Sequence, residues 1–298
     1  MGNPRKGGHP GWYHFAVNSV PLYFASGESL YLGAALLVTA CFVPRRWSLA
    51  RSVSAWLGLI LMVVACPPLS WFTYASLGCL FLLWLFIPKQ ARWVSIVVTV
   101  SLIALVLLIA GSEFSHRKLP LIAGVRDSHL VIIGDSLSSG LGEATPWPVV
   151  LEETSGIGVK NLARAGAGVH EALGMAAHVF SDDHVVLLEI GGNDLLAGLP
   201  SDKFAEGLEE LLIKVCSPRR TVVMLELPLI PSKIGYGQVQ RRLSEKYHVW
   251  LIPKRFLADG LRADTTSDGL HLSPRGAGRM AAFVASALSG VLSTSNVR

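Results

Sequence analysis

Long apolar runs fill most of the first 111 residues of this 298-residue chain, and they limit its fold more than any other feature. A membrane-spanning helix needs about 20 mostly apolar residues, with a range of about 17–25. We therefore predict an all-α transmembrane region of about four helices over residues 1–111. The third and fourth runs fit this length, whereas the first two must include flanking residues. The predicted spans are 30–43, 53–66, 71–87 and 93–110.

The sequence CPPLS, residues 66–70, separates the second span from the third. Proline lacks a backbone N–H and clashes with the preceding helical turn, so two consecutive prolines indicate a tight loop between helices. The alternative is a three-helix region in which one long helix is kinked. No cleavable signal peptide is indicated, because the first long apolar run begins late and no small-residue cleavage site stands out.

The composition is typical of a membrane protein. Hydrophobic residues make up 51% of the chain and charged residues 16%, and the mean hydropathy is +0.47. The formal net charge of +5 comes from scattered basic residues beside apolar runs, which argues against nucleic-acid binding. The four cysteines form no CxxC pair and no Cys/His zinc spacing, so we expect no structural metal and no disulfide framework.

Lys and Arg concentrate on the cytoplasmic side of membrane proteins, and this bias predicts the orientation. With four spans, the two loops at one end receive more basic residues than the other end does. That first end is predicted to be cytoplasmic, which places the second half of the chain in the periplasm or outside a bacterial inner membrane. The first end receives Arg45, Arg46, Arg51, Lys89 and Arg92, and the other receives Arg117, Lys118 and Arg126.

A predicted linker, residues 112–126, leads into a second region, residues 127–298, where short apolar runs alternate with helix-like stretches. This alternation predicts a parallel β-sheet covered by helices on both faces. The predicted strands are 129–134, 159–163, 184–190, 221–227 and 248–253. The predicted helices lie around 147–153, 203–216, 238–247 and 274–292.

Reactive residues in such sheets lie at the carboxyl ends of the strands. Ser136 follows the first predicted strand, and His271 lies between the fifth strand and the last helix. A serine hydroxyl becomes a nucleophile when a base takes its proton, and histidine is the usual base at neutral pH. Asp268 is the candidate to orient His271, with Asp259 and Asp264 as nearby alternatives.

An acyl-transfer site also needs hydrogen-bond donors for the oxyanion of its tetrahedral intermediate. The candidates are the backbone N–H groups of Ser136 and Gly166 and the side-chain amide of Asn193. Gly168 is an alternative to Gly166. Asp135 and Asp194, each next to a candidate residue, are predicted to support the turns after the first and third strands. No glycine-rich nucleotide fingerprint is present, and we expect no cofactor.

Residues 127–292 resemble the SGNH hydrolases, also called the GDSL esterase/lipase family. The four marker residues match Ser136 in GDSL, Gly166, Asn193 in GGND and His271 in DGLH, and the catalytic acid of the family falls on Asp268. The segments LEIGGNDLLAGLP, TPWPVVLEE and LELPLIP are similar to the bacterial thioesterase, lysophospholipase and arylesterase branch. The resemblance implies an SGNH-type, flavodoxin-like three-layer α/β/α domain with a five-stranded parallel sheet.

The expected function is that of a membrane-anchored serine esterase that acts on lipid or acyl-chain esters through an acyl-Ser136 intermediate. Its expected partner is this ester substrate, with no cofactor and no metal. One alternative is a deacetylase or acyl transferase that acts on extracytoplasmic glycans. A second is a non-catalytic SGNH-like module that binds lipid or glycan. A transporter is disfavoured, because the predicted spans contain almost no charged residues.

Overall fold

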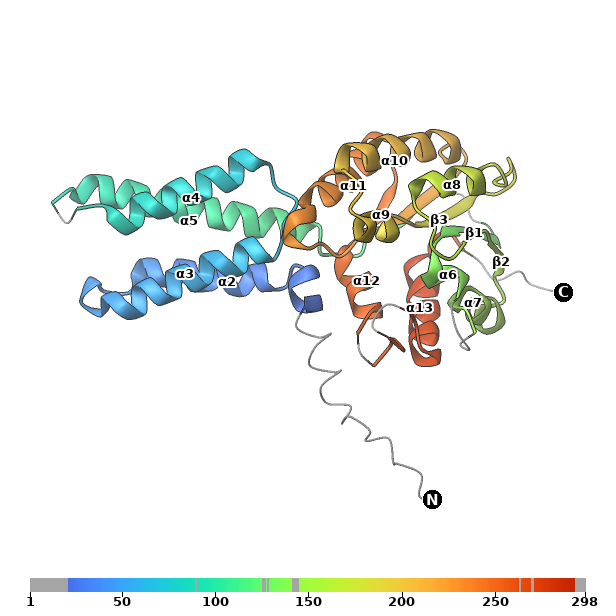
Figure 1. The fold of residues 1–298 in the computed structure, drawn as a ribbon, viewed down its shortest axis with the longest axis horizontal. Helices are drawn as coiled ribbons and strands as arrows, with labels where there is room; N and C mark the ends of the chain where they lie inside the picture. The colour runs from blue at the N-terminus through green and yellow to red at the C-terminus, as the bar shows by residue number, and fades with distance from the viewer. Residues whose placement is uncertain are drawn as a thin grey trace, which may run out of the picture.

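The computed structural model describes residues 21–88, 90–124, 127, 129–140, 145–262, 264–268 and 271–292. It has two parts, a slender group of helices from the first half of the chain and a larger α/β domain from the second half (Figure 1). The helices form two hairpins that point away from the domain. The chain therefore returns to the surface of the domain twice, once between the two hairpins and once after the second.

A helix forms at each of the four long apolar runs, and a short turn, η1 (Arg45–Trp47), joins the first two. The residues around Pro67 and Pro68 form the loop between the hairpins, which excludes the single kinked helix. Among the helices of the described residues, α5 alone is long and apolar enough to cross a membrane, by length and composition; the other three are shorter apolar helices. The four helices are α2 (Ser29–Phe42), α3 (Ser48–Val64), α4 (Trp71–Phe86) and α5 (Arg92–Ser115).

The second half contains one five-stranded parallel sheet in the order β2-β1-β3-β4-β5. The prediction of a parallel sheet is therefore confirmed, and each strand overlaps the segment predicted for it. The central strands β1, β3 and β4 are buried except for His129 at the start of β1, because both faces of the sheet carry helices, and this explains their continuous apolar sequences. The strands are β1 (His129–Gly134), β2 (Gly158–Asn161), β3 (Val185–Glu189), β4 (Thr221–Leu225) and β5 (Trp250–Ile252).

Helices cover the sheet in two outer layers (Figure 1). In one layer α10 packs against α8 and α11, and in the other α13 packs against α7 and α12. The four predicted helices correspond to α7, α10, α11 and α13. The layers contain α7 (Trp147–Ser155), α8 (Val169–Ala176), α10 (Ser201–Val215), α11 (Ile234–Lys246), α12 (Lys254–Gly260) and α13 (Pro274–Ala287).

Three short elements lie in loops that the sequence pattern left unassigned. They are α6 (Ser136–Ser139), α9 (Gly192–Ala197) and η2 (Pro231–Lys233). None is long enough to show an amphipathic repeat, and α8 and α12 were missed for the same reason. Helix α5 also continues to Ser115, so the predicted linker begins with helical residues.

A buried ion-pair network joins the helical region to the α/β domain. Arg241 on α11 donates from Nε to Glu226 Oε1 at 2.7 Å and from Nη2 to Glu113 Oε2 at 3.1 Å. Glu113 lies in the last turns of α5, and Glu226 directly follows β4. The flanking Lys254 is also buried, and its desolvation lowers the pKa of its ammonium group. Three elements far apart in the sequence are thus held by one guanidinium.

The loop between the two helical hairpins also contacts the domain. The Gln238 side chain donates to the Leu69 carbonyl, and Lys254 Nζ donates to the Cys66 carbonyl at 3.4 Å. Cys66 is buried in the core of the α/β domain and not in that of the helices. These contacts, together with the ion pairs, fix the base of the helical region on the domain.

Replacing Arg241 should weaken this junction, because Glu113 and Glu226 would remain buried without their cation. Loss of one partner from a buried ion pair costs about 3–5 kcal/mol. We expect Arg241→Ala to lower the unfolding temperature and to speed proteolysis near residues 112–124. The control is Arg242→Ala, on the exposed side of the same helix. Equal stability of the two variants, measured by thermal unfolding in detergent, would contradict this role.

Candidate active site

The carboxyl end of the sheet brings together the residues that the sequence pattern selected. Ser136 begins α6 directly after β1, and Asn193 lies in α9 directly after β3. Gly166 lies in the turn between β2 and α8, and His271 lies in the loop between α12 and α13. The short connections after parallel strands all emerge at this edge, which explains the convergence of residues far apart in the chain.

Asp268 and His271 form a hydrogen-bonded pair. Asp268 Oδ2 lies 2.6 Å from His271 Nδ1, and Asp268 Oδ1 accepts from the His271 backbone N–H at 2.8 Å. Asp259 pairs instead with Arg262, and Asp264 with Arg279. Among the three candidate aspartates, only Asp268 contacts the histidine. Because this carboxylate occupies Nδ1, the imidazole presents Nε2 as the nitrogen able to accept a proton.

Ser136 is half-buried at the mouth of a small hollow. The same hollow is lined by Leu272, the residue next to His271, and by Trp147 and Ala277. The serine and the histidine loop therefore face a common space. Within the described residues, the Ser136 hydroxyl makes no hydrogen bond to His271.

The turn after β2 distinguishes Gly166 from Gly168. Gly166 has a φ of +77°, a left-handed conformation that favours glycine, and open space lies in front of it. Gly168 instead packs against Asp194, where a Cβ would lie 2.5 Å from Oδ1. The Gly168 N–H also donates to Glu171 Oε2 at 2.9 Å. Gly166 is therefore the glycine of this turn that faces open space.

Asn193 is tied to the two neighbouring turns. Its Nδ2 donates to Asp135 Oδ2 at 3.1 Å and to the Ala167 carbonyl at 3.0 Å. Both amide hydrogens are thus engaged in this state. A bond from Asn193 to an oxyanion would require one of these two bonds to weaken or be shared. The amide links the turns after β1, β2 and β3.

The two aspartates predicted to support turns are buried, and burial raises the pKa of both. Asp135 Oδ1 accepts from the Leu137 N–H at 3.0 Å, so it caps the turn that carries Ser136. Asp194 Oδ2 accepts from the Val169 N–H at 3.0 Å. Asp194 therefore also anchors the start of α8, beyond the turn of Asn193 for which it was predicted.

Glu189 is a site residue that the sequence analysis missed. It ends β3, lies opposite Gly134 in the sheet register and is 2% exposed. Its Oε2 accepts from the Asp135 N–H at 3.2 Å and from Ser138 Oγ at 2.9 Å. Ser138 Oγ in turn accepts from Trp147 Nε1 at 3.2 Å. The sequence feature that could have identified Glu189 is its position as an acidic residue at the end of an otherwise apolar strand, just before GGND.

Burial raises the pKa of Glu189 well above its ordinary value, and the nearby Asp135 carboxylate raises it further. Both effects favour the protonated form of Glu189, which shares a hydrogen bond with the Asp135 side chain. The two carboxyl groups bind the backbone on both sides of Ser136. Among the described residues, no group of three or more His, Cys, Asp or Glu side chains is placed to hold a metal ion.

Two replacements of Glu189 should distinguish the effect of its ionisation from the effect of its hydrogen bonds. A carboxyl group whose pKa is raised by folding stabilises the fold fully below its unfolded pKa of about 4.3, and this contribution is lost as pH rises toward the folded pKa. Glu189→Gln mimics the neutral acid, so unfolding free energy should depend less on pH above about 5. Glu189→Ala should lose about 1–3 kcal/mol, because buried donors lose their acceptor.

Denaturant unfolding of the wild type and both variants across pH 5–9 measures these effects. An identical pH slope in the wild type and in Glu189→Gln would show that Glu189 is already ionised in the folded protein.

Comparison with known proteins finds relatives of the α/β domain. The model of the GDSL-like Lipase/Acylhydrolase family matches residues 132–279, from β1 to α13. An arylesterase of Vibrio mimicus is 28% identical over 179 residues, which cover 53% of this chain and 87% of that protein. Thioesterase 1/protease 1/lysophospholipase L1 of Escherichia coli K12 is 26% identical over 136 residues, which cover 42% of this chain and 65% of that protein.

Solved structures are similar to the same share of the chain. The crystal structure of TesA has a TM-score of 0.48 and 24% identity, and covers 55% of this chain and 99% of that chain. The psychrotrophic esterase EstA from Pseudoalteromonas sp. has a TM-score of 0.46 and 24% identity, and covers 53% of this chain and 96% of that chain.

Proposed function

We propose that this chain, a serine ester hydrolase whose residues 132–279 form a GDSL-like lipase/acylhydrolase domain, is anchored in a membrane and cleaves lipid or acyl-chain esters. The hydrogen bond between Asp268 and His271, beside the hollow that Ser136 lines, carries the assignment of the catalytic residues. A binding module would have no use for a paired histidine at this position.

In the proposed reaction, Ser136 Oγ attacks the ester carbonyl carbon while His271 Nε2 takes the hydroxyl proton. Asp268 holds the imidazole and stabilises its positive charge. The negative oxygen of the tetrahedral intermediate accepts from the backbone N–H groups of Ser136 and Gly166, and from Asn193 once its amide turns toward it. Collapse of the intermediate releases the alcohol with the proton from His271. Water, activated by the same histidine, then frees the acid from Ser136.

The helical region supports the membrane anchor, because its outer faces are apolar. The buried residues of α5 follow a single stripe, and about half of its other side chains are exposed and apolar. Water-exposed apolar surface of this extent is unstable in a soluble monomer. The buried residues are Val98, Leu102, Val106, Ile109 and Glu113. The large exposed ones on α5 include Val94, Ile96, Val97, Val100, Leu107 and Leu108.

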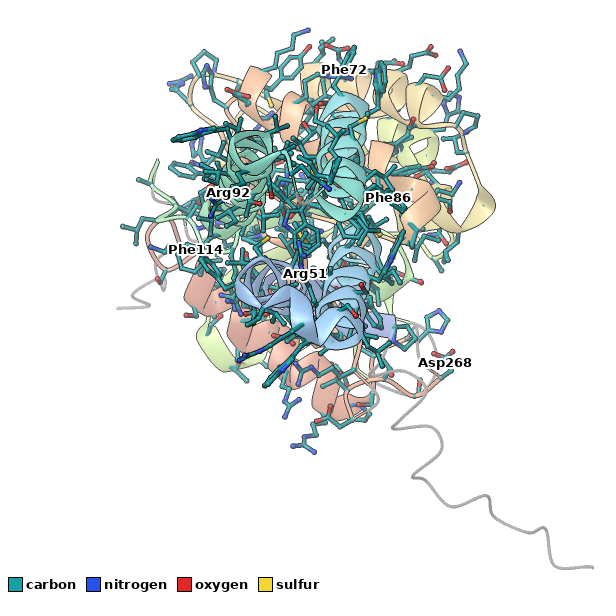
Figure 2. All side chains as sticks on the ribbon, turned by 90° about the vertical axis from the view of Figure 1, so that its left-hand side faces the viewer. Arg51, Phe72, Phe86, Arg92, Phe114 and Asp268 are labelled. Atoms are coloured by element: carbon teal, nitrogen blue, oxygen red, sulfur yellow. The ribbon has the colours of Figure 1, made fainter. Side chains whose placement is uncertain are left out.

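Exposed aromatic side chains gather at both ends of the helices, as at the two interfaces of a bilayer. Phe86 ends α4 and Arg92 begins α5 at the free end, whereas Phe72 and Phe114 lie near the opposite ends of these two helices, beside the domain (Figure 1). Figure 2 looks along the helices from the free end and labels all four residues. The set at the free end is Phe42, Trp47, Phe86 and Trp93. The set near the domain is Tyr23, Trp71, Phe72 and Phe114.

The packing of α2 on α3 also supports a membrane location. A Cβ on Gly33 would lie 2.7 Å from the Gly58 carbonyl oxygen, so the two backbones touch. Close contact through small residues is typical of transmembrane helices, which gain little from hydrophobic burial. Helices of 14, 16 and 17 residues are about 21–26 Å long, slightly shorter than the apolar core of about 30 Å. A bilayer thins around short spans at modest cost.

Loss of the nucleophile should abolish covalent labelling by a fluorophosphonate probe. We expect the wild type to be labelled and Ser136→Ala to be silent, with ester hydrolysis reduced about 10⁴-fold or more. Ser139→Ala, on the same short helix, is the matched control and should label normally. Labelling that survives in Ser136→Ala would place the nucleophile elsewhere. A preference for acetyl over long acyl esters would favour the glycan deacetylase.

The topology of the anchor can be tested with introduced cysteines in intact cells. The native Cys216 is a poor target, because burial raises the pKa of its thiol to about 11. Lys203→Cys lies on the exposed side of α10, and Gln90→Cys lies in the loop at the free end of the helices. A membrane-impermeant maleimide should label the first directly and the second only after permeabilisation. The reverse pattern would place the hydrolase domain in the cytoplasm.

A further inference from the structure

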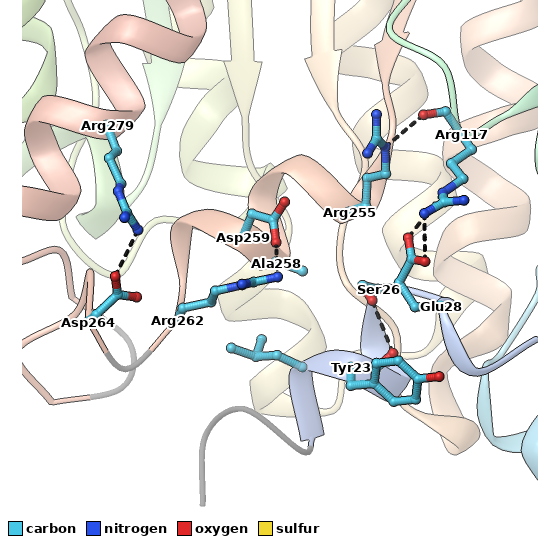
Figure 3. A pocket seen from close by; sticks show the side chains of 11 residues that line it. Tyr23, Ser26, Glu28, Arg117, Arg255, Ala258, Asp259, Arg262, Asp264 and Arg279 are labelled. Atoms are coloured by element: carbon cyan, nitrogen blue, oxygen red, sulfur yellow. Dashed lines mark hydrogen bonds and ion pairs between the residues drawn. The ribbon is translucent and has the colours of Figure 1, made fainter. Parts of the chain in front are cut away.

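A cavity of about 630 Å³ lies where the base of the helical region meets α12 and α13 (Figure 3). One wall comes from residues 22–28, just before α2, and the opposite wall from α12, α13 and the loop between them. It shares none of its lining residues with the hollow at Ser136. Its size is that of a small-molecule site, for which volumes of about 300–1,000 Å³ are typical.

Arginine dominates this cavity. Four arginines line it, against three carboxylates, and they are Arg117, Arg255, Arg262 and Arg279. Three of them have a carboxylate partner in the wall: Arg117 with Glu28 at 2.7 Å, Arg262 with Asp259 at 2.7 Å and Arg279 with Asp264 at 2.9 Å. The cavity therefore has one uncompensated positive charge.

Arg255 carries that charge. Its Nε donates to the Arg117 carbonyl at 2.8 Å, and it has no carboxylate partner within the described residues. Figure 3 shows Arg255 and Arg117 next to each other at one side of the cavity. A guanidinium has five N–H donors, so the cavity wall retains several that these contacts leave unused. Such forked donors match the oxygens of a phosphate.

A second, more apolar hollow of about 310 Å³ adjoins the first. Asp259, Arg262 and Arg279 line both, so the two spaces meet at these side chains. The second hollow also presents Phe256 and Phe283, whose rings stack at a centroid distance of 4.8 Å, and Met280. A cationic cavity joined to an apolar hollow has the polarity of an amphiphile.

We propose that this double cavity binds the phosphate headgroup of an anionic glycerophospholipid, with an acyl chain along Phe256 and Phe283. Arg255 and Arg262 bind the phosphate oxygens. The inference rests on the proposed membrane anchor, because the cavity borders the helix ends where Tyr23 and Phe114 mark the predicted interface. Ester hydrolysis is not required for binding.

The bound lipid would contact the loop that carries the proposed catalytic pair. Arg279 on α13 holds Asp264, four positions before Asp268 in the same loop. In the view from the free end of the helices, Asp268 lies to one side of the helices and is not hidden behind them (Figure 2). The loop between α12 and α13 therefore contributes residues both to the proposed phospholipid site and to the hollow at Ser136.

Calorimetric titration of the full-length protein in non-ionic detergent tests the site. Dihexanoyl phosphatidylglycerol is the probe, and the Ser136→Ala background prevents its hydrolysis, so binding is read independently of the proposed activity. Arg255→Gln and Arg262→Gln should each weaken binding about tenfold, the loss expected for one charge-assisted hydrogen bond. Arg219→Gln, an exposed arginine in the turn before β4, should leave binding unchanged.

Dihexanoylglycerol, which lacks the phosphate, should bind weakly and equally to all variants. Inorganic phosphate should bind far more weakly than the lipid. Phosphate binding as tight as that of the lipid would overturn the lipid assignment in favour of a free-anion site. Lipid binding that is unchanged in both folded arginine variants would overturn the site itself. Arg262 has a 61% exposed side chain, so its replacement tests the proposal even if Arg255→Gln fails to fold.

Discussion

The buried pair of Asp135 and Glu189 is the interaction on which the geometry of the site depends. Both carboxyl groups are buried, and burial together with the nearby Asp135 carboxylate raises the pKa of Glu189. Glu189 binds the backbone just before Ser136, while Asp135 binds the backbone just after it and the amide of Asn193. The carboxyl ends of β1 and β3 are thus locked together behind the serine.

Buried charged groups also fix the junction between the two parts of the molecule. There a buried arginine, Arg241, is shared by Glu113 of the helical region and Glu226 of the α/β domain. Buried ion pairs add little net stability, but they are intolerant of misplacement, because a displaced partner leaves a buried charge. The orientation of the domain on the helices, and hence the placement of the arginine-lined cavity at the helix ends, follows from this contact.

Much of this arrangement could be predicted from the sequence. Apolar runs identified the helices and strands because burial on both sides produces continuous hydrophobic sequence. GDSL and GGND pointed to Ser136 and Asn193 because each motif follows a strand, and DGLH pointed to His271 although α12 lies between β5 and that motif. Asp268 could not be separated from Asp259 and Asp264 by spacing, since each is close to His271 in the chain. Only the three-dimensional structure shows that the other two pair with arginines.

Other features depend on contacts between distant segments and leave no local signal. In the sequence, Glu189 is an ordinary residue at a strand end, and only the fold shows that its side chain contacts Asp135. The engagement of Asn193 with Ala167 joins the turns after two different strands. The four apolar helices were predicted correctly, but helix length identifies only α5 as a candidate span, so the number of spans remains a prediction.

The central claim is that Ser136 carries the acyl group during turnover. Rapid acid quenching of the full-length protein during hydrolysis of a p-nitrophenyl ester, followed by peptide mass spectrometry, tests it most directly. The account predicts that the acyl mass appears on the peptide that contains Ser136 and disappears as substrate is exhausted. Steady hydrolysis with the acyl group on another residue, or with no acyl-enzyme at any time point, would contradict it.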